Sequence, residues 1–178
     1  MPSAALPSPL ARAEERLFQL GIGWWRSWKA ANALDGGQRS SSLASAAGAF
    51  VAHDVVDASG CELHMVQCRR VEGPDGARAP PLVLLHGYGS GTGIYYAALP
   101  PLAEAWPGSV YALDSPGCGL SSRPRWTSGV QECSVSAAED WWIERLEGWR
   151  ETMGIENFVL CGHSIGGYMA VACVQRPL

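Results

Sequence analysis

The sequence predicts the α/β class: a mainly parallel sheet with an antiparallel hairpin at its amino-terminal end. The first observation is a set of short apolar runs, at Leu82–His86, Val110–Leu113 and Asn157–Cys161, which are typical of strands buried on both faces of a parallel sheet. The second is that segments with helical spacing of apolar residues separate these runs. Strands that alternate with helices form a parallel sheet covered by helices. A chain of 178 residues is long enough for one such domain.

Residues 1–34 predict an amphipathic helix rich in tryptophan. Its apolar positions within 11–31 recur at helical spacing, at Leu17, Leu20, Trp24 and Trp28, with Phe18, Ile22 and Trp25 widening the same face. Indole rings prefer the headgroup level of a lipid surface, and arginine and lysine lie nearby in the sequence. The segment therefore predicts peripheral attachment to a membrane or lipid droplet. The alternative is a helix docked on its own domain.

The segment at residues 35–48 is rich in Ser, Gly and Ala and predicts a linker. Met1–Leu10 has neither the cationic start nor the apolar core of a secretory signal, and no stretch approaches the length of a membrane span. We therefore expect a cytoplasmic protein that is peripheral on a lipid surface. An organelle transit peptide is a second interpretation, against which Glu14, Glu15 and Asp35 count.

The sequence pattern of residues 49–178 predicts that this part of the chain forms the α/β domain. Phe50–Ala58 and Cys61–Arg70 both alternate and flank Ser59-Gly60, which predicts the hairpin. Helices are expected over Tyr95–Trp106, over Ser136–Met153 with its tryptophans in the core, and from the turn after Cys161 to about Val174.

Composition excludes several classes of function. The formal net charge of −4 and the lack of a dense basic patch give no reason to expect a nucleic-acid partner. The six cysteines show no CxxC spacing, so we expect no structural zinc, and a reducing compartment. No cofactor is expected.

The segment Gly162-His163-Ser164-Ile165-Gly166-Gly167 predicts a strand, a very sharp turn and a helix. A serine on such a turn projects its hydroxyl above the sheet, and flanking glycines are needed because a Cβ there would collide with the neighbouring strand and helix. We therefore interpret Ser164 as a nucleophile. The alternative is an ordinary glycine-rich connection between a strand and a helix.

Acyl transfer from an ester also needs backbone N–H donors for the oxygen that becomes negatively charged. The amide of Ile165 starts a helix, and the amide of Tyr88 lies in the glycine-rich loop Gly87–Gly93 that follows His86, where Gly89 helps the backbone approach a substrate. A phosphate cradle is the alternative for this loop, but the Gly-Lys-Ser/Thr end of a P-loop is missing.

Three motifs occur in the order known from one superfamily: His86-Gly87, Asp114-Ser-Pro-Gly-Cys-Gly-Leu-Ser121 and Gly162 to Gly167. From Phe50 to Leu178 the chain resembles the α/β-hydrolase superfamily. The details of these segments, together with Glu147-Gly-Trp-Arg150, resemble its branch of lysophospholipases, lysophosphatidic-acid acyltransferases and cardiolipin deacylases. The resemblance implies a carboxylic ester hydrolase whose nucleophile is Ser164, with a lipid or acyl-ester substrate.

The chain departs from that family after the nucleophile. A triad needs a histidine and an acid, which in this fold follow the serine, and residues 165–178 contain neither. The histidines lie upstream and are interpreted as structural, with His163 pointing away from its neighbour; Asp114 is interpreted as a turn former. The His-x-x-x-x-Asp pattern of the acyltransferases is also absent.

We therefore expect residues 49–178 to be the amino-terminal half of a hydrolase, truncated after the nucleophile helix. Lipid ester hydrolysis is the expected family function, with acyltransferase activity open for a full-length protein, and the chain alone is expected to do little of it. A noncatalytic lipid-surface adaptor that recruits a lipase is the alternative. A small-molecule esterase is a third interpretation.

Overall fold

The computed structural model describes residues 9–10, 12–14, 16–20, 49–70, 79–125 and 134–176, with the backbone alone for 49–54 and 69–70. Its elements in chain order are β1 (Ala49–Ala58), β2 (Cys61–Arg70), β3 (Leu82–Leu85), the 3₁₀-helix η2 (Thr92–Tyr95), α2 (Leu99–Ala105), β4 (Val110–Leu113), α3 (Val135–Thr152), β5 (Val159–Gly162) and α4 (Ile165–Gln175). The described residues of segment 9–20 are helical too, and we call them the amino-terminal helix. The predicted linker and Trp24, Trp25 and Trp28 lie outside the described residues.

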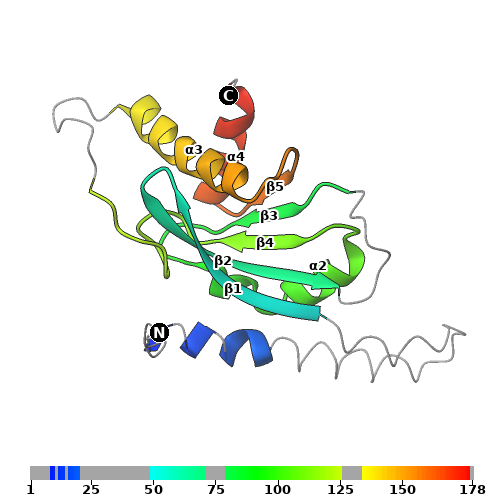
Figure 1. The fold of residues 1–178 in the computed structure, drawn as a ribbon. Coiled ribbons are helices and arrows are strands. Elements are labelled where there is room, and N and C mark those ends of the chain that lie inside the picture. The colour runs from blue at the N-terminus through cyan, green and yellow to red at the C-terminus, as the bar shows by residue number, and fades with distance from the viewer. Residues whose placement is uncertain are drawn as a thin grey trace, which may run out of the picture.

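Five strands form one sheet in the order β1-β2-β4-β3-β5 (Figure 1). β2 is antiparallel to both β1 and β4, whereas β3 is parallel to both β4 and β5. The predicted α/β class and amino-terminal hairpin are confirmed. Because the four pairings divide evenly between parallel and antiparallel, the described sheet is mixed.

The hairpin turn explains how β1 and β2 meet α3. Ser59 and Gly60 have φ of 50° and 73°, and left-handed backbone at both positions matches the twist of a two-residue hairpin. The tip lies on α3, where the Ser59 hydroxyl donates to the carbonyl of Glu144 at 3.4 Å. A Cβ on Gly148 would come within 2.7 Å of Ser59 Oγ, so a glycine in mid-helix permits this close approach.

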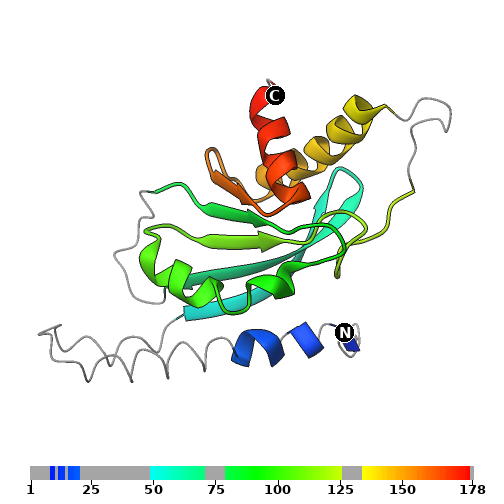
Figure 2. The same cartoon turned by 180° about the vertical axis from the view of Figure 1, so that it is seen from behind.

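Two layers of helices cover the sheet. α3 and α4 lie on one face, while α2, η2 and the amino-terminal helix lie on the other (Figures 1 and 2). Alternation along β3 supplies both cores: Val83 and Leu85 face α3, and Leu82 and Leu84 face α2.

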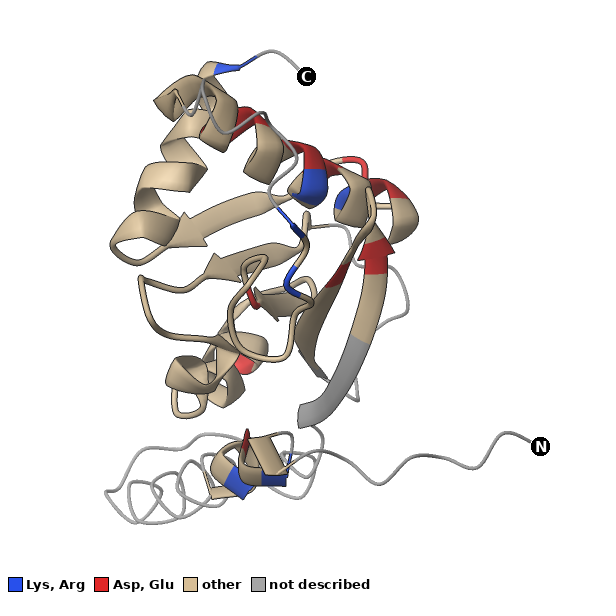
Figure 3. Ribbon diagram, turned by 90° about the vertical axis from the view of Figure 1, so that its left-hand side faces the viewer, with Lys and Arg blue, Asp and Glu red and all other residues tan. Residues whose placement is uncertain are grey.

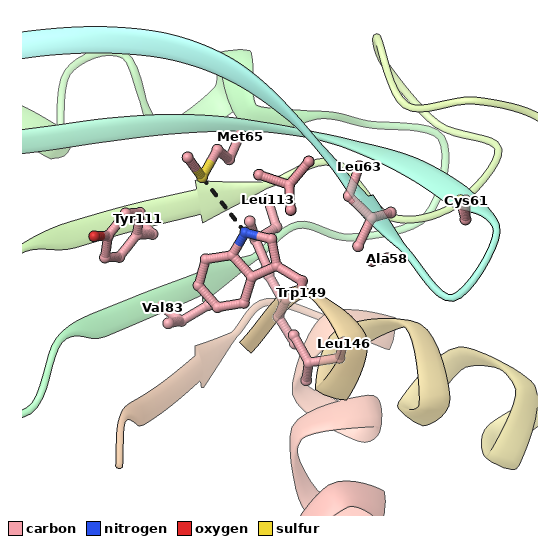
Figure 4. Packing of buried hydrophobic residues seen from close by; sticks show 11 residues of the cluster. Ala58, Cys61, Leu63, Met65, Val83, Tyr111, Leu113, Leu146 and Trp149 are labelled. Atoms are coloured by element: carbon pink, nitrogen blue, oxygen red, sulfur yellow. Dashed lines mark hydrogen bonds between the residues drawn. The ribbon is translucent and has the colours of Figure 1, made fainter. Parts of the chain in front are cut away.

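Trp149 of α3 is the centre of the first core. It is fully buried, its indole N–H lies 3.4 Å from the sulfur of Met65, and the ring of Tyr111 meets it edge-on at 5.5 Å between centroids (Figure 4). Trp142 packs against the same cluster. The prediction that this second group of tryptophans serves the core is confirmed for both residues.

Phe18 brings the amino-terminal helix into the second core. Its side chain is 1% exposed and packs in one cluster with Val66, Leu84 and Ala112. The described part of this helix is therefore docked on its own domain. Leu17 and Leu20, which the helical spacing places at the centre of the apolar face, are 40% and 66% exposed instead. The face that is buried is set by tertiary contact, and periodicity alone did not identify it.

The prediction of one helix over Tyr95–Trp106 was wrong for the first part of that range. The structure has η2, then a turn, and α2 begins only at Leu99. Pro100 and Pro101 explain the break, since proline lacks the N–H of a helix interior and is accepted in its first turn. Across the described residues, no helix combines the length and apolar character needed to cross a bilayer.

Candidate active site

Ser164 occupies the turn between β5 and α4 with a strained backbone. Its φ of 57° and ψ of −122° fall outside the regions that L-residues favour, and its side chain is exposed. Among the described non-glycine residues, only Ser59 shares a positive φ. Such strain persists only where the surroundings impose it, and it gathers at functional sites.

The glycines beside Ser164 show what imposes the strain. A Cβ on Gly162 would lie 2.2 Å from the carbonyl carbon of Gly166, and a Cβ on Gly166 would lie 2.4 Å from the carbonyl oxygen of Leu85. Strand, turn and helix are thus in contact through their backbones. This is the close packing that the sequence motif predicts.

Gly87 brings the loop after β3 against the same turn. A Cβ on Gly87 would approach Nδ1 of His163 to 2.9 Å and Cβ of Ser164 to 3.2 Å. Tyr88 follows directly and is 91% exposed, and Gly89 has a φ of 66°. The loop that carries the Tyr88 amide therefore begins in contact with Ser164.

The second predicted donor is the amide of Ile165. Ile165 is the first residue of α4, so its N–H has no carbonyl one turn earlier in the helix. The positive end of the helix dipole points the same way. Both predicted donors thus belong to segments that contact the serine.

His86 is buried and both of its ring nitrogens have partners. Nδ1 donates to the carbonyl of Gly87 at 2.7 Å, and Nε2 accepts from the amide of Ser115 at 3.0 Å. These partners assign the neutral Nδ1–H tautomer. The ring joins the end of β3 to the end of β4 and has no nitrogen left to accept a proton from a serine.

Asp114, at the end of β4, is a buried hub for two loops. Its carboxylate accepts from the amides of Thr92 at 2.6 Å and Leu120 at 2.8 Å, and from Nδ1 of His64 at 2.8 Å. Burial raises its pKa, but the hydrogen bonds from His64 and from the two amides outweigh burial, so the pKa is lowered. Gly119, with a φ of 48°, leaves room for this carboxylate, which a Cβ would meet at 2.0 Å.

Two residues near Asp114 were not predicted as part of any site. His64 is buried on β2, and its Nε2 lies 3.4 Å from Oε2 of Glu14, which is buried in turn. The Thr92 hydroxyl donates to the other carboxylate oxygen of Glu14. The sequence could have indicated that His64 is buried, because His64, Val66 and Cys68 occupy alternate positions of one strand and so share the face that meets the second core.

Glu14, His64 and Asp114 offer ligand atoms within 4.8 Å of one another, which is close enough to hold a metal ion. Their contacts favour a different interpretation. Nδ1 of His64 bonds directly to Asp114 at 2.8 Å, and both Asp114 oxygens also accept backbone N–H donors, so the Asp114 lone pairs that a metal would need are directed at protons. We interpret the cluster as a buried polar network that joins β2, β4 and the amino-terminal helix.

The Ser164 hydroxyl has no activating group among the described residues. None of their histidines or carboxylates forms a hydrogen bond with it, and His64 and His86 bind other groups. The sequence after it, residues 165–178, contains no Asp, Glu or His. The site thus combines the strained, exposed Ser164 with the two backbone amides that the sequence predicts as oxyanion donors.

A strained serine between a strand and a helix, beside a glycine loop, defines the class of α/β proteins with a nucleophile elbow. Residues 80–177, more than half of the chain, match the alpha/beta hydrolase fold family, and the chain belongs to this family.

Two relatives show where in the family the similarity is high. Over 92 residues the chain is 41% identical to human 1-acylglycerol-3-phosphate O-acyltransferase ABHD5. This match covers 52% of the present chain and 24% of the human protein. Over 100 residues it is 41% identical to a probable 1-acylglycerol-3-phosphate O-acyltransferase of Oryza sativa, covering 56% and 23%. The matched region therefore spans about a quarter of these curated relatives.

Solved structures agree on the fold. An epoxide hydrolase from Vigna radiata matches with a TM-score of 0.55 at 17% identity, covering 70% of this chain and 36% of that one. A haloalkane dehalogenase from Agrobacterium tumefaciens matches with a TM-score of 0.52 at 22% identity, covering 71% and 37%. At these identities the likeness establishes the fold.

Proposed function

We propose that the chain carries the nucleophile and the oxyanion hole of a serine hydrolase acting on fatty-acyl esters of phospholipids and lysophospholipids. The observation that carries this proposal is the strained, exposed Ser164 on a turn closed by Gly162 and Gly166. The lipid class is supported by the relatives, whose names give 1-acylglycerol-3-phosphate, an acyl ester of a phosphorylated glycerol, as substrate.

In the proposed reaction, Oγ of Ser164 attacks the acyl carbonyl carbon and loses its proton to a base. The amides of Tyr88 and Ile165 donate to the oxygen that becomes negative. The ester C–O bond then breaks, the alcohol leaves with a proton, and water hydrolyses the acyl-serine. An acyltransferase differs only in the last step, where a second alcohol takes the acyl group.

The base of this reaction is the group that the described residues do not supply, and this suggests a direct test. Imidazole in solution can act as an external general base where a histidine is missing. The 178-residue chain is incubated with a fluorophosphonate probe over a range of imidazole concentrations. We expect Ser164 to be labelled at a rate that rises with imidazole and disappears in Ser164→Ala.

Three outcomes are decisive for this experiment. Equal labelling of Ser164→Ala would overturn the assignment of the nucleophile. Labelling without imidazole dependence would show that the chain holds its own base. Imidazole-dependent hydrolysis of a short p-nitrophenyl ester that exceeds the rate measured with Ser164→Ala at the same imidazole concentration, with none of a lysophospholipid, would favour the small-molecule esterase.

A second candidate is a noncatalytic lipid-surface adaptor, peripheral on a membrane or lipid droplet from the cytoplasm. It is supported by Leu10, Leu17 and Leu20, which are 51%, 40% and 66% exposed on the amino-terminal helix, beside exposed Arg16. In the sequence, Trp24, Trp25 and Trp28 continue this spacing.

Flotation with phospholipid vesicles tests the adaptor. We expect Leu20→Glu combined with Trp24→Ala to lower vesicle binding, and Ser164→Ala to leave it unchanged. Unchanged binding of the first variant would rule out attachment through this helix. Imaging of a fluorescent fusion separates the lipid-droplet surface from the alternative of import into an organelle.

A further inference from the structure

We propose that Glu14 is a positioning residue for the oxyanion loop, defined here as residues 87–95. The amino-terminal helix would then brace the site from the far side of the loop, through a buried polar link. This inference rests on the proposed function only for its effect on reactivity. Its structural part stands on the contacts of Glu14, Thr92 and Asp114.

The first step is the burial of Glu14 between two partners from distant segments. Its side chain is 8% exposed, Oε1 accepts from the Thr92 hydroxyl, and Oε2 lies 3.4 Å from Nε2 of His64. A carboxylate is rarely buried unless it is paired and hydrogen-bonded. The helix thus places a buried carboxyl group, as well as the apolar Phe18, against the domain.

The second step is that Thr92 is held from both sides. Its hydroxyl donates to Glu14 of the amino-terminal helix, and its amide donates to Oδ1 of Asp114 at the end of β4, 2.6 Å away. Thr92 is fully buried. The start of η2 is therefore fixed between the helix and the sheet.

The third step connects Thr92 to the nucleophile. The oxyanion loop is short and has internal hydrogen bonds, from the amide of Ser90 to the carbonyl of Gly87 at 3.3 Å and from the amide of Ile94 to the carbonyl of Gly91 at 3.3 Å. At its start, Gly87 contacts Ser164 and His163. A displacement at Thr92 therefore reaches the Tyr88 amide, and donors must be aimed closely to stabilise an oxyanion.

Conservative substitutions separate the role of Glu14 in the loop from its role in stability. Glu14→Gln keeps an acceptor for the Thr92 hydroxyl and removes the ionisable carboxyl group, whereas Glu14→Ala removes both. Thr92→Val removes the hydroxyl and keeps the amide bond to Asp114. Phe18→Leu weakens the same helix contact through apolar packing alone and is the matched control.

Hydrogen exchange of the loop amides is the primary measurement, made on the 178-residue chain. We expect Glu14→Ala and Thr92→Val each to speed exchange of the Thr92 and Ile94 amides about tenfold, since each deletes one buried hydrogen bond. The double variant should show little further change, because both substitutions remove the same bond. Glu14→Gln should retain most of the protection.

The outcomes distinguish this inference from the proposed function. Unchanged exchange at Thr92 in Glu14→Ala, or an equal rise across all strands in Glu14→Ala and Phe18→Leu, would overturn the positioning role. If exchange changes as expected while Ser164 is never labelled by a fluorophosphonate, the brace stands and the hydrolase proposal fails. If both hold, imidazole-dependent labelling should fall in Glu14→Ala and recover in Glu14→Gln.

Discussion

The face of the sheet under the amino-terminal helix and the edge of the sheet at β5 differ in how they are covered. On the amino-terminal side, Phe18 and Glu14 are buried against the strands, and the loops near Asp114 are tied together by hydrogen bonds. On the other side, β5 pairs only with β3 among the described strands, and its residues alternate between exposed and half-buried. The apolar α4 beside it leaves Val171 and Val174 at 56% and 85% exposure.

This difference runs through the candidate site. The oxyanion loop belongs to the covered side, whereas Ser164 sits between β5 and α4, which carry no charged residue and are drawn without red or blue in Figure 3. The loop is thus held by polar and apolar contacts, while Ser164 is held by backbone contact at its neighbouring glycines. The two halves of the site should respond differently to substitution.

The largest expected effect tests the covered side. Phe18→Ala should lower the free energy of unfolding by about 3 kcal/mol or more, because it empties a fully enclosed aromatic site. Urea denaturation followed by tryptophan fluorescence measures the change. Leu20→Ala on the same helix is the control, and it should stay within about 0.5 kcal/mol because Leu20 is largely exposed. Equal losses in the two variants would contradict the docking of this helix.

The second prediction tests the turn itself. Gly162→Ala should cost about 2–3 kcal/mol, because its Cβ would overlap the backbone at Gly166. Thermal unfolding measures it, together with the reactivity of Ser164. Gly93→Ala is the matched control, since its Cβ would meet only ordinary contacts at 3.8 Å. A neutral Gly162→Ala would mean that the turn is not closed by backbone contact.

The third prediction concerns pH and Asp114. Its pKa is lowered from an ordinary value near 3.8. Its carboxylate therefore adds stability that is present above that value and lost as the pH falls through the lower pKa of the folded state. The urea midpoint should drop as the pH falls below about 4, and the drop should be smaller in Asp114→Asn, which keeps the shape without the titration. An identical pH profile for both proteins would contradict the hub at Asp114.

The smallest effect on stability is expected on the exposed side. Val171→Lys with Val174→Lys should change the free energy of unfolding by no more than about 0.5 kcal/mol and should reduce self-association, since exposed apolar surface beside an edge strand favours it. Sedimentation velocity measures the association. Val135→Lys, at the exposed start of α3, serves as the control and should not reduce it. Self-association that persists in the double variant would place the contact elsewhere.

Local signals in the sequence predicted most of the fold. The apolar runs identify β3, β4 and β5 to within two residues, and Ser59-Gly60 identifies the hairpin turn. These elements depend on neighbouring residues, so a single sequence carries enough information. The turn at Ser164 belongs to the same group, because its glycines are required by contacts within a few residues and with β3.

The network of Glu14, His64 and Asp114 could not be predicted in this way. Asp114 and His64 are 50 residues apart, and Thr92 and Glu14 are 78 residues apart, so their contact exists only once the sheet and helix have docked. The prediction of which face of the amino-terminal helix is buried was wrong for the same reason. Its apolar spacing allows several faces, and the choice of Phe18 is made by the surface it meets.

The glycine at position 148 has a consequence for the order of folding. A glycine in mid-helix costs about 1 kcal/mol relative to alanine, and an isolated helix of the 18 residues of α3 is marginal in water. A lone two-stranded hairpin is marginal as well. The absence of a side chain at Gly148 lets the hairpin tip at Ser59 pack against α3. The hairpin and α3 therefore stabilise each other through this contact. We therefore expect α3 and the β1–β2 hairpin to form together in one cooperative step, even though 76 residues of chain separate Ala58 from Val135.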